Sequence, residues 1–239
     1  MANSIQDISL LNLSVAFIPM IVVLGIMFKW HMNYGNAIYA TLRMVIQLLI
    51  IGYFLVFIFN TESSWIVLGV LFVMVVASSW IALGVIKQQQ RKLFVSTLTA
   101  IIIGGGITLA IVSQGVLVLD PWYSPRYMIP LAGMIFANAM NTVSLAVERL
   151  NSELTNGVDY DKARFIAFQA AMIPVINSLF AVGLVSLPGM MTGQILSGVS
   201  PLIAVRYQIV VMCMVFSSAG ISSALFLVIA RKYFVKQPS

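Results

Sequence analysis

Residues 148–164, with the sequence ERLNSELTNGVDYDKAR, form a charged island between two long apolar runs. About a third of the charged side chains of the protein lie in it: Glu148, Arg149, Glu153, Asp159, Asp161, Lys162 and Arg164. Apolar runs of about twenty residues are long enough to cross a bilayer as helices. The island is therefore either a solvated loop between two spans or the place where a membrane protein contacts a soluble partner.

The composition decides the class of protein. Hydrophobic residues make up 61% of the chain and charged residues 8%, with a mean hydropathy of +1.02. A soluble domain is about half apolar and a quarter charged. The sequence therefore predicts an all-α integral membrane protein. We attribute the net charge of +6 to basic residues gathered on the cytoplasmic side, and expect no nucleic-acid partner.

Seven apolar runs predict seven transmembrane helices in a single permease domain, residues 1–239: residues 8–28, 37–59, 65–86, 94–119, 128–147, 165–187 and 208–230. Pro19 is expected to kink the first helix, which we interpret as retained rather than as a signal peptide. The three glycines at 104–106 are expected to interrupt the fourth helix. Residues 188–207, broken by Gly and Pro, predict a re-entrant or surface-lying segment before the last helix.

The distribution of basic residues predicts the orientation. With the N-terminus outside, ten Lys and Arg residues fall on the inner side, and only Arg126 and Arg206 on the outer side. Cytoplasmic loops carry an excess of Lys and Arg. We therefore expect a multi-pass protein of the cell membrane with the N-terminus outside and the C-terminus inside. The island 148–164 then lies in the cytoplasm.

Several kinds of chemistry are missing from the sequence. No G-x-x-x-x-G-K-[ST] motif is present, so the chain lacks the loop that cradles ATP phosphates. One histidine, His31, and one cysteine, Cys213, do not make a His/Cys/carboxylate metal site, and no cofactor is expected in this chain. Cys213 is expected to be a small hydrophobic residue. The 14 methionines could bind soft ions such as Cu(I), but membrane packing explains most of them.

Polar side chains within the apolar runs are candidates for a substrate path, because such residues are costly in lipid and usually face protein or a cavity. The candidates are Asn138, Asn141, Asn177, Met190, Met191 and Gln194. The alternative is that the amides only hold helices together, each bond contributing about 1 kcal/mol or less.

Arg43 lies within the second predicted span, where an unpaired Arg costs on the order of 2 kcal/mol or more. We expect it to pair with Glu148, the first residue of the charged island. Gln47, backbone carbonyls and extension of the side chain to lipid phosphate are the alternatives.

Several motifs resemble the FetB-type permeases, the membrane subunits of iron-export ABC transporters, a family that includes plant aluminium-tolerance permeases. In the first half, Arg43, Ile46-Gln47-Leu48 and Gly52-Tyr53 fit the family pattern R-x-x-I-Q-L-x-x-x-G-Y. In the second half the resemblance runs through MIPLAGMIFANAMN (128–141), ERLNSEL (148–154) and IPVINSLFAVGLVSLPGMMTGQILSGVSP (173–201). It covers nearly the whole chain, but family members carry a longer loop where residues 156–159 stand here.

The resemblance implies a permease that forms a homodimer and binds a separate ABC-type ATPase subunit through a cytoplasmic coupling loop, here residues 148–164. ATP would be bound by that partner, and the solute would be iron, another metal or a small molecule. Two other classes remain: a seven-helix receptor or sensor, and a membrane-embedded enzyme. The absence of a Ser/His/Asp set argues against the enzyme.

Overall fold

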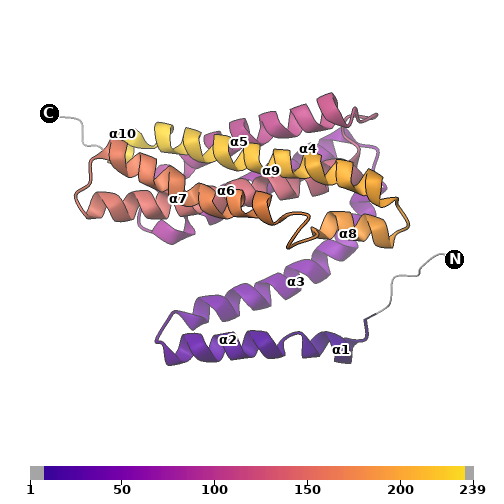
Figure 1. Cartoon of the computed structure of the whole chain (residues 1–239), viewed down its shortest axis with the longest axis horizontal. Helices are drawn as coiled ribbons and strands as arrows, with labels where there is room; N and C mark the ends of the chain where they lie inside the picture. The colour runs from indigo at the N-terminus through magenta and orange to yellow at the C-terminus, as the bar shows by residue number, and fades with distance from the viewer. Residues whose placement is uncertain (1–7, 235–239) are drawn as a thin grey trace. The chain divides into compact units, whose positions relative to one another are not determined.

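The computed structural model describes residues 8–234, and nearly all of them are helical (Figure 1). Within this range the one strand-like feature is an isolated bridge between Val182 and Ser186. Seven helical stretches are long and apolar enough to cross a membrane: Leu10–Lys29, Tyr34–Phe59, Ser64–Ile86, Gln90–Val116, Pro125–Thr155, Tyr160–Ala181 and Pro201–Ile229. The prediction of an all-α membrane protein with about seven spans is confirmed. The residues group into two compact units, which are described separately below. That residues 1–239 form a single permease domain stays a prediction.

The first unit, residues 1–61, contains α1 (Leu10–Val15), α2 (Ile18–Lys29) and α3 (Tyr34–Phe59). The first predicted span is not one kinked helix, because α1 ends before α2 begins. Pro19 lies in the first turn of α2, where a missing backbone N–H costs nothing. Helices α2 and α3 pack on each other, and Asn33 caps α3 by accepting a bond from the Asn36 N–H at 3.3 Å.

The second unit, residues 62–239, is built around one long helix, α6 (Pro125–Thr155). Against it pack α4 (Ser64–Ala82), α5 (Gln90–Ala110), α7 (Tyr160–Ala181) and α9 (Pro201–Ile229). The 3₁₀ turn η1 (Leu83–Ile86) continues α4, the π-helical turn η2 (Ile111–Val116) continues α5, and α10 (Arg231–Phe234) follows α9. Small buried residues such as Ala132, Ala139 and Ala146 let several helices approach α6 closely.

The three glycines do not interrupt the fourth predicted span, and that prediction is wrong. Helix α5 runs unbroken through them, and two of the three, Gly104 and Gly105, lie where it crosses its neighbours. A Cβ at Gly104 would overlap the Ser222 hydroxyl of α9 and lie 2.7 Å from the Ser222 backbone nitrogen. At Gly105 it would lie 3.0 Å from side-chain atoms of Ile135 and Phe136 on α6. The missing side chains of Gly104 and Gly105 serve close helix packing, whereas a Cβ at Gly106 would meet nothing within 4 Å.

The charged island is also mostly helical, contrary to the prediction of a loop. Helix α6 continues to Thr155 and α7 already begins at Tyr160, so four residues, 156–159, connect them. Gly157 has a φ of +80°, its N–H donates to the Leu154 carbonyl, and the Val158 N–H donates to the Glu153 carbonyl. This pattern is a Schellman motif, which ends a helix where glycine takes the left-handed conformation. It reverses the chain within one short turn.

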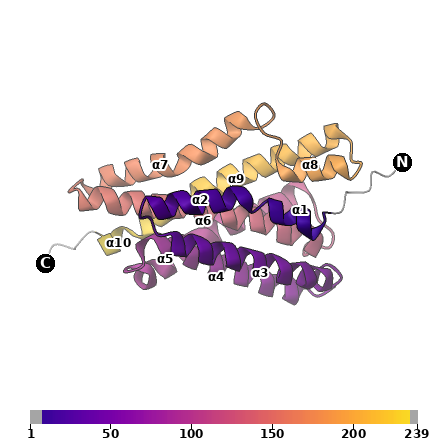
Figure 2. The same ribbon diagram turned by 90° about the horizontal axis from the view of Figure 1, so that it is seen from below.

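Boundaries on the other side of α7 differ as well. Helix α7 ends at Ala181 rather than at residue 187, and α9 begins at Pro201 rather than at residue 208. The predicted segment 188–207 therefore consists of α8 (Gly189–Leu196), a short turn and the beginning of α9. Helix α8 packs beside that beginning, as Figures 1 and 2 show. Whether α8 is re-entrant or surface-lying stays a prediction.

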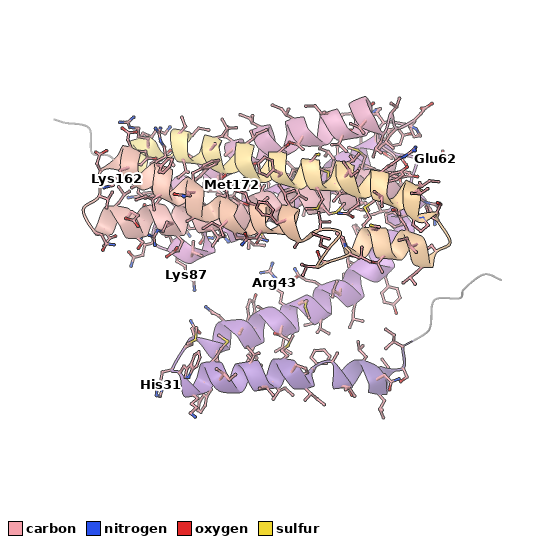
Figure 3. The ribbon with its side chains drawn as sticks, in the orientation of Figure 1. His31, Arg43, Glu62, Lys87, Lys162 and Met172 are labelled. Carbon is pink, nitrogen blue, oxygen red and sulfur yellow. The ribbon has the colours of Figure 1, made fainter. Side chains whose placement is uncertain are left out.

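The labelled charges in Figure 3 agree with alternating spans in the second unit. Lys87 and Lys162, both predicted to be cytoplasmic, lie toward one end of this unit, and Glu62 lies toward the other. Lys87 lies between α4 and α5, and Lys162 lies just after the connection between α6 and α7. These two connections are therefore at the same end of the unit, as expected for spans that alternate in direction. The assignment of these ends to the inside and outside of the cell stays a prediction.

Candidate functional site

The charged island carries two of its ion pairs on helices rather than in a loop. Near the end of α6, Arg149 Nη2 lies 2.6 Å from Glu153 Oε1, four residues further along the helix. The Glu153 side chain is only 11% exposed, so this pair is partly shielded from solvent. At the beginning of α7, Asp161 Oδ1 lies 3.2 Å from Arg164 Nη2. Glu148 and Lys162 are exposed.

The beginning of α7 is capped and fixed to α9. Asp159 is the N-cap and accepts a bond from the Asp161 N–H at 3.0 Å, a typical way to satisfy a free N–H at a helix start. The buried Tyr160 donates its hydroxyl proton to the Leu227 carbonyl of α9 at 2.6 Å. Burial and this bond hold Tyr160 in one position against the last span.

A residue just after α9 completes the connection. Arg231 Nη2 lies 3.4 Å from Asp161 Oδ2, and its guanidinium lies 5.6 Å from the centre of the Tyr160 ring. A cation over an aromatic face contributes about 0.5–1 kcal/mol at an exposed site. We call the contacts of Tyr160 and Asp161 with Leu227 and Arg231 the α7–α9 clasp. The clasp therefore joins the beginning of α7 to the C-terminal end of α9.

Tyr160 and Arg231 are not among the residues predicted from the sequence. Nothing in the spacing shows that Asp161 and Arg231, 70 positions apart, meet. The available signal was Tyr160 itself, a large aromatic residue in an otherwise polar segment. Beside the clasp lies a cavity of about 240 Å³, lined by both polar and apolar side chains: Asp161, Arg164, Phe165, Phe168, Ala224, Leu227 and Val228.

The predicted path residues are distributed over α6, α7 and α8. The Asn138 amide donates to the Met134 carbonyl of its own helix at 2.8 Å, while Asn141 on α6 and Asn177 on α7 are exposed at the surface of the second unit. An exposed amide on an apolar helix calls for a partner, since lipid offers none. The path through these three residues stays a prediction.

The predicted pair of Arg43 and Glu148 would connect the first unit to the second. Both side chains are exposed within their own units. The pairing stays a prediction, and exchange of the two charges in a double variant is its test.

The segment around α8 borders a large cavity. A half-open cavity of about 360 Å³ lies between the end of α7, the following turn, α8 and α9. Met191 lines it, whereas Met190 lines a separate, smaller cavity of about 40 Å³. The Gln194 side-chain oxygen is buried and has no hydrogen-bond partner among the described residues. Of the predicted candidates, Met191 alone lines the large cavity.

Gln208 also lines this cavity and is not among the predicted candidates. It is 5% exposed, and neither its amide nitrogen nor its amide oxygen has a partner in the described part of the chain. The predicted last span began at residue 208, which placed this glutamine at a membrane surface. Ser200-Pro201, a helix-start signal with Pro in the first turn, could have placed it seven residues inside α9.

Metal-binding groups of the usual kind are missing from the described residues. No group of three His, Cys, Asp or Glu side chains there is arranged to hold an ion. Sulfur-containing side chains are different: Met191, Met212 and Cys213 all line the large cavity.

These features define a helical, multi-pass membrane protein with seven candidate spans and a charged, helical reversal between the fifth and the sixth. The chain belongs to the uncharacterised protein family UPF0014, whose profile matches residues 10–235. No solved structure matches the chain.

Three relatives show how the family extends across organisms. The chain is 36% identical to the UPF0014 membrane protein slr1647 of Synechocystis over 84% of its own length and 83% of the relative's. It is 36% identical to the protein ALUMINUM SENSITIVE 3 of Arabidopsis thaliana, over 85% and 80% of the two chains. It is 34% identical to the probable iron export permease protein FetB of Escherichia coli, over 89% and 87%. The resemblance stated from the sequence is confirmed.

Proposed function

We propose that this chain is the membrane-spanning permease subunit of an ATP-binding-cassette transporter, exporting iron, another metal or a small solute from the cell. It works as a homodimer, and two copies of a separate ATPase subunit bind at the cytoplasmic end of α6 and α7. The name of the Escherichia coli relative, an iron export permease, supports the transport role. The absence of a phosphate-binding loop from the chain requires ATP to be bound elsewhere.

The α6–α7 reversal is the observation that carries this proposal. It presents exposed charges on two helices joined by four residues, and the Schellman motif and the Asp159 cap hold it in shape. A rigid, charged projection such as this α6–α7 reversal suits docking to a soluble subunit. Its loop is already ordered, so binding costs little further conformational entropy. The α7–α9 clasp then gives that projection a mechanical connection to the last span.

The test is purification of the tagged chain from membranes of its own organism, followed by identification of proteins that remain bound. A partner with a G-x-x-x-x-G-K-[ST] motif, present in equal number with this chain, is the expected result. ATP hydrolysis by the reconstituted complex should rise when the transported solute is added. A complex with a single copy of the chain, or one without a nucleotide-binding partner, would overturn the proposal.

A charge reversal locates the docking surface. Lys162→Glu should weaken binding of the ATPase subunit, since Lys162 is exposed at the α6–α7 projection. Arg206→Glu is the matched control, because Arg206 is also exposed but lies near the start of α9, at the predicted outer side. Equal loss of binding in both variants would show that the projection is not the docking surface.

A further inference from the structure

The large cavity beside α8 combines a buried, unpaired amide with three sulfur atoms. Its wall is otherwise apolar, yet Gln208 is 95% buried there without a hydrogen-bond partner for its amide. An unsatisfied buried amide costs about 1–3 kcal/mol, and such a group in a native protein calls for an explanation. A ligand in the cavity supplies one.

The sulfur atoms come from two different helices. Met191 belongs to α8, and Met212 and Cys213 belong to α9, where Gln208 and Met212 are four residues apart on one face. Cys213 is the thirteenth of the 29 residues of α9, close to the middle of the span. The donors therefore border one half-open space at the middle of α9, and the exposed Cys213 lies at its edge.

The charge of the donors restricts the ion. No Asp, Glu or His is among the residues that line the cavity. Thioethers and the amide are neutral, so a single Cys213 thiolate is the one negative charge available. A monovalent cation forms a neutral site with it, whereas a divalent cation would leave an uncompensated charge in apolar surroundings, at a cost of several kcal/mol. Soft sulfur ligands favour Cu(I) over hard ions.

We infer that the cavity lined by Met191, Gln208, Met212 and Cys213 is a binding site for a soft monovalent metal ion of the Cu(I) class. Binding replaces the S–H bond of Cys213 by a sulfur–metal bond and releases the proton to the buffer, with no transfer of electrons. Met191 and Met212 complete the coordination, and Gln208 supplies the polar atoms of the wall. That the ion is the transported solute rests on the proposed function; the binding itself does not.

The experiment measures Cu(I) binding to the purified full chain in detergent, without oxygen and with ascorbate, in competition with the chromophoric chelator bathocuproine disulfonate. We expect one Cu(I) per chain, with sulfur ligands in the X-ray absorption spectrum. Cys213→Ser should abolish this binding, and Met191→Leu or Met212→Leu should weaken it by about tenfold or more. Fe(II) and Zn(II) should not compete.

Matched controls lie next to the proposed ligands. Met190→Leu and Met214→Leu change neighbouring methionines that do not line this cavity, so both should bind Cu(I) as the unaltered chain does. The thermal unfolding midpoint of each variant checks that it is folded. No saturable binding by the unaltered chain, or equal binding by Cys213→Ser, would overturn the inference.

The two proposals fail separately. The binding assay contains no ATPase, so absence of Cu(I) binding overturns the metal site and leaves the permease proposal standing. Cu(I) binding by a chain that recruits no nucleotide-binding partner overturns the permease proposal and leaves the metal site standing.

Discussion

Alanine substitutions along the glycine run test how closely α5 approaches its neighbours. In a helix interior Ala is favoured over Gly by about 1 kcal/mol, so propensity alone predicts that each substitution stabilises the protein. The surroundings differ at the three positions. The Cβ of Gly106→Ala would meet nothing within 4 Å, that of Gly105→Ala would meet side-chain atoms at 3.0 Å, and that of Gly104→Ala would meet the Ser222 backbone.

The magnitude follows from what must move. A carbon 2.7 Å from the Ser222 backbone nitrogen lies well inside the ordinary contact distance of about 3.5 Å, so α5 and α9 must separate by nearly 1 Å. Overpacking of this kind costs about 1–3 kcal/mol, and a backbone neighbour cannot rotate away. We therefore expect Gly104→Ala to be destabilised by about 1 kcal/mol net and Gly106→Ala to be neutral or stabilised by up to about 1 kcal/mol. Gly105→Ala should fall between them, because the Ile135 and Phe136 side chains can shift slightly.

The assay is thermal unfolding of the purified chain in detergent, followed by intrinsic tryptophan fluorescence. The expected order of unfolding midpoints is Gly106→Ala highest, Gly105→Ala next and Gly104→Ala lowest, several degrees below the unaltered chain. A midpoint for Gly104→Ala equal to or above that of Gly106→Ala would refute the close crossing of α5 and α9.

Three further predictions concern the clasp, the path and the orientation. Tyr160→Phe removes the hydrogen bond to the Leu227 carbonyl and should lower the free energy of unfolding by about 1 kcal/mol, whereas Tyr233→Phe, at an exposed tyrosine, should not change it. Asn141→Leu and Asn177→Leu should each reduce transport in reconstituted vesicles; normal transport by both variants would leave these amides with a packing role only. A protease site added at the C-terminus should be cut in inverted vesicles and protected in intact cells, and the opposite pattern would reverse the predicted orientation.

Much of the fold could be predicted from the sequence because it depends on local properties. A run of about twenty apolar residues is sufficient to define a span, and each predicted run overlaps one long helical stretch of the structure, although some boundaries differ by up to eight residues. Charges are likewise a local property, so the island at 148–164 was correctly identified as the most polar part of the second half. The family resemblance rested on short motifs and needed no contacts.

Helix boundaries and the role of glycine depended on neighbours and were predicted less well. A glycine triplet weakens an isolated helix. In the folded protein, however, the backbone of α9 lies so close to Gly104 that a side chain at this position would not fit. Residues 148–155 look like a loop because they are charged, and they stay helical because Leu150 and Glu153 are buried against the rest of the unit. Polarity is a poor guide to helix ends where a helix extends beyond the bilayer.

The sequence by itself determined that this is a helical membrane protein of the UPF0014 family with a charged segment between two spans, because hydropathy, charge and motifs are properties of consecutive residues. The tertiary structure alone decided which distant residues meet. Tyr160 reaches Leu227 because the reversal at Gly157 brings α7 back beside α6, and α9 then packs along both helices. Met191 faces the same cavity as Met212 and Cys213 because α8 folds back against α9. Such contacts depend on the packing of whole helices, which no stretch of sequence specifies alone.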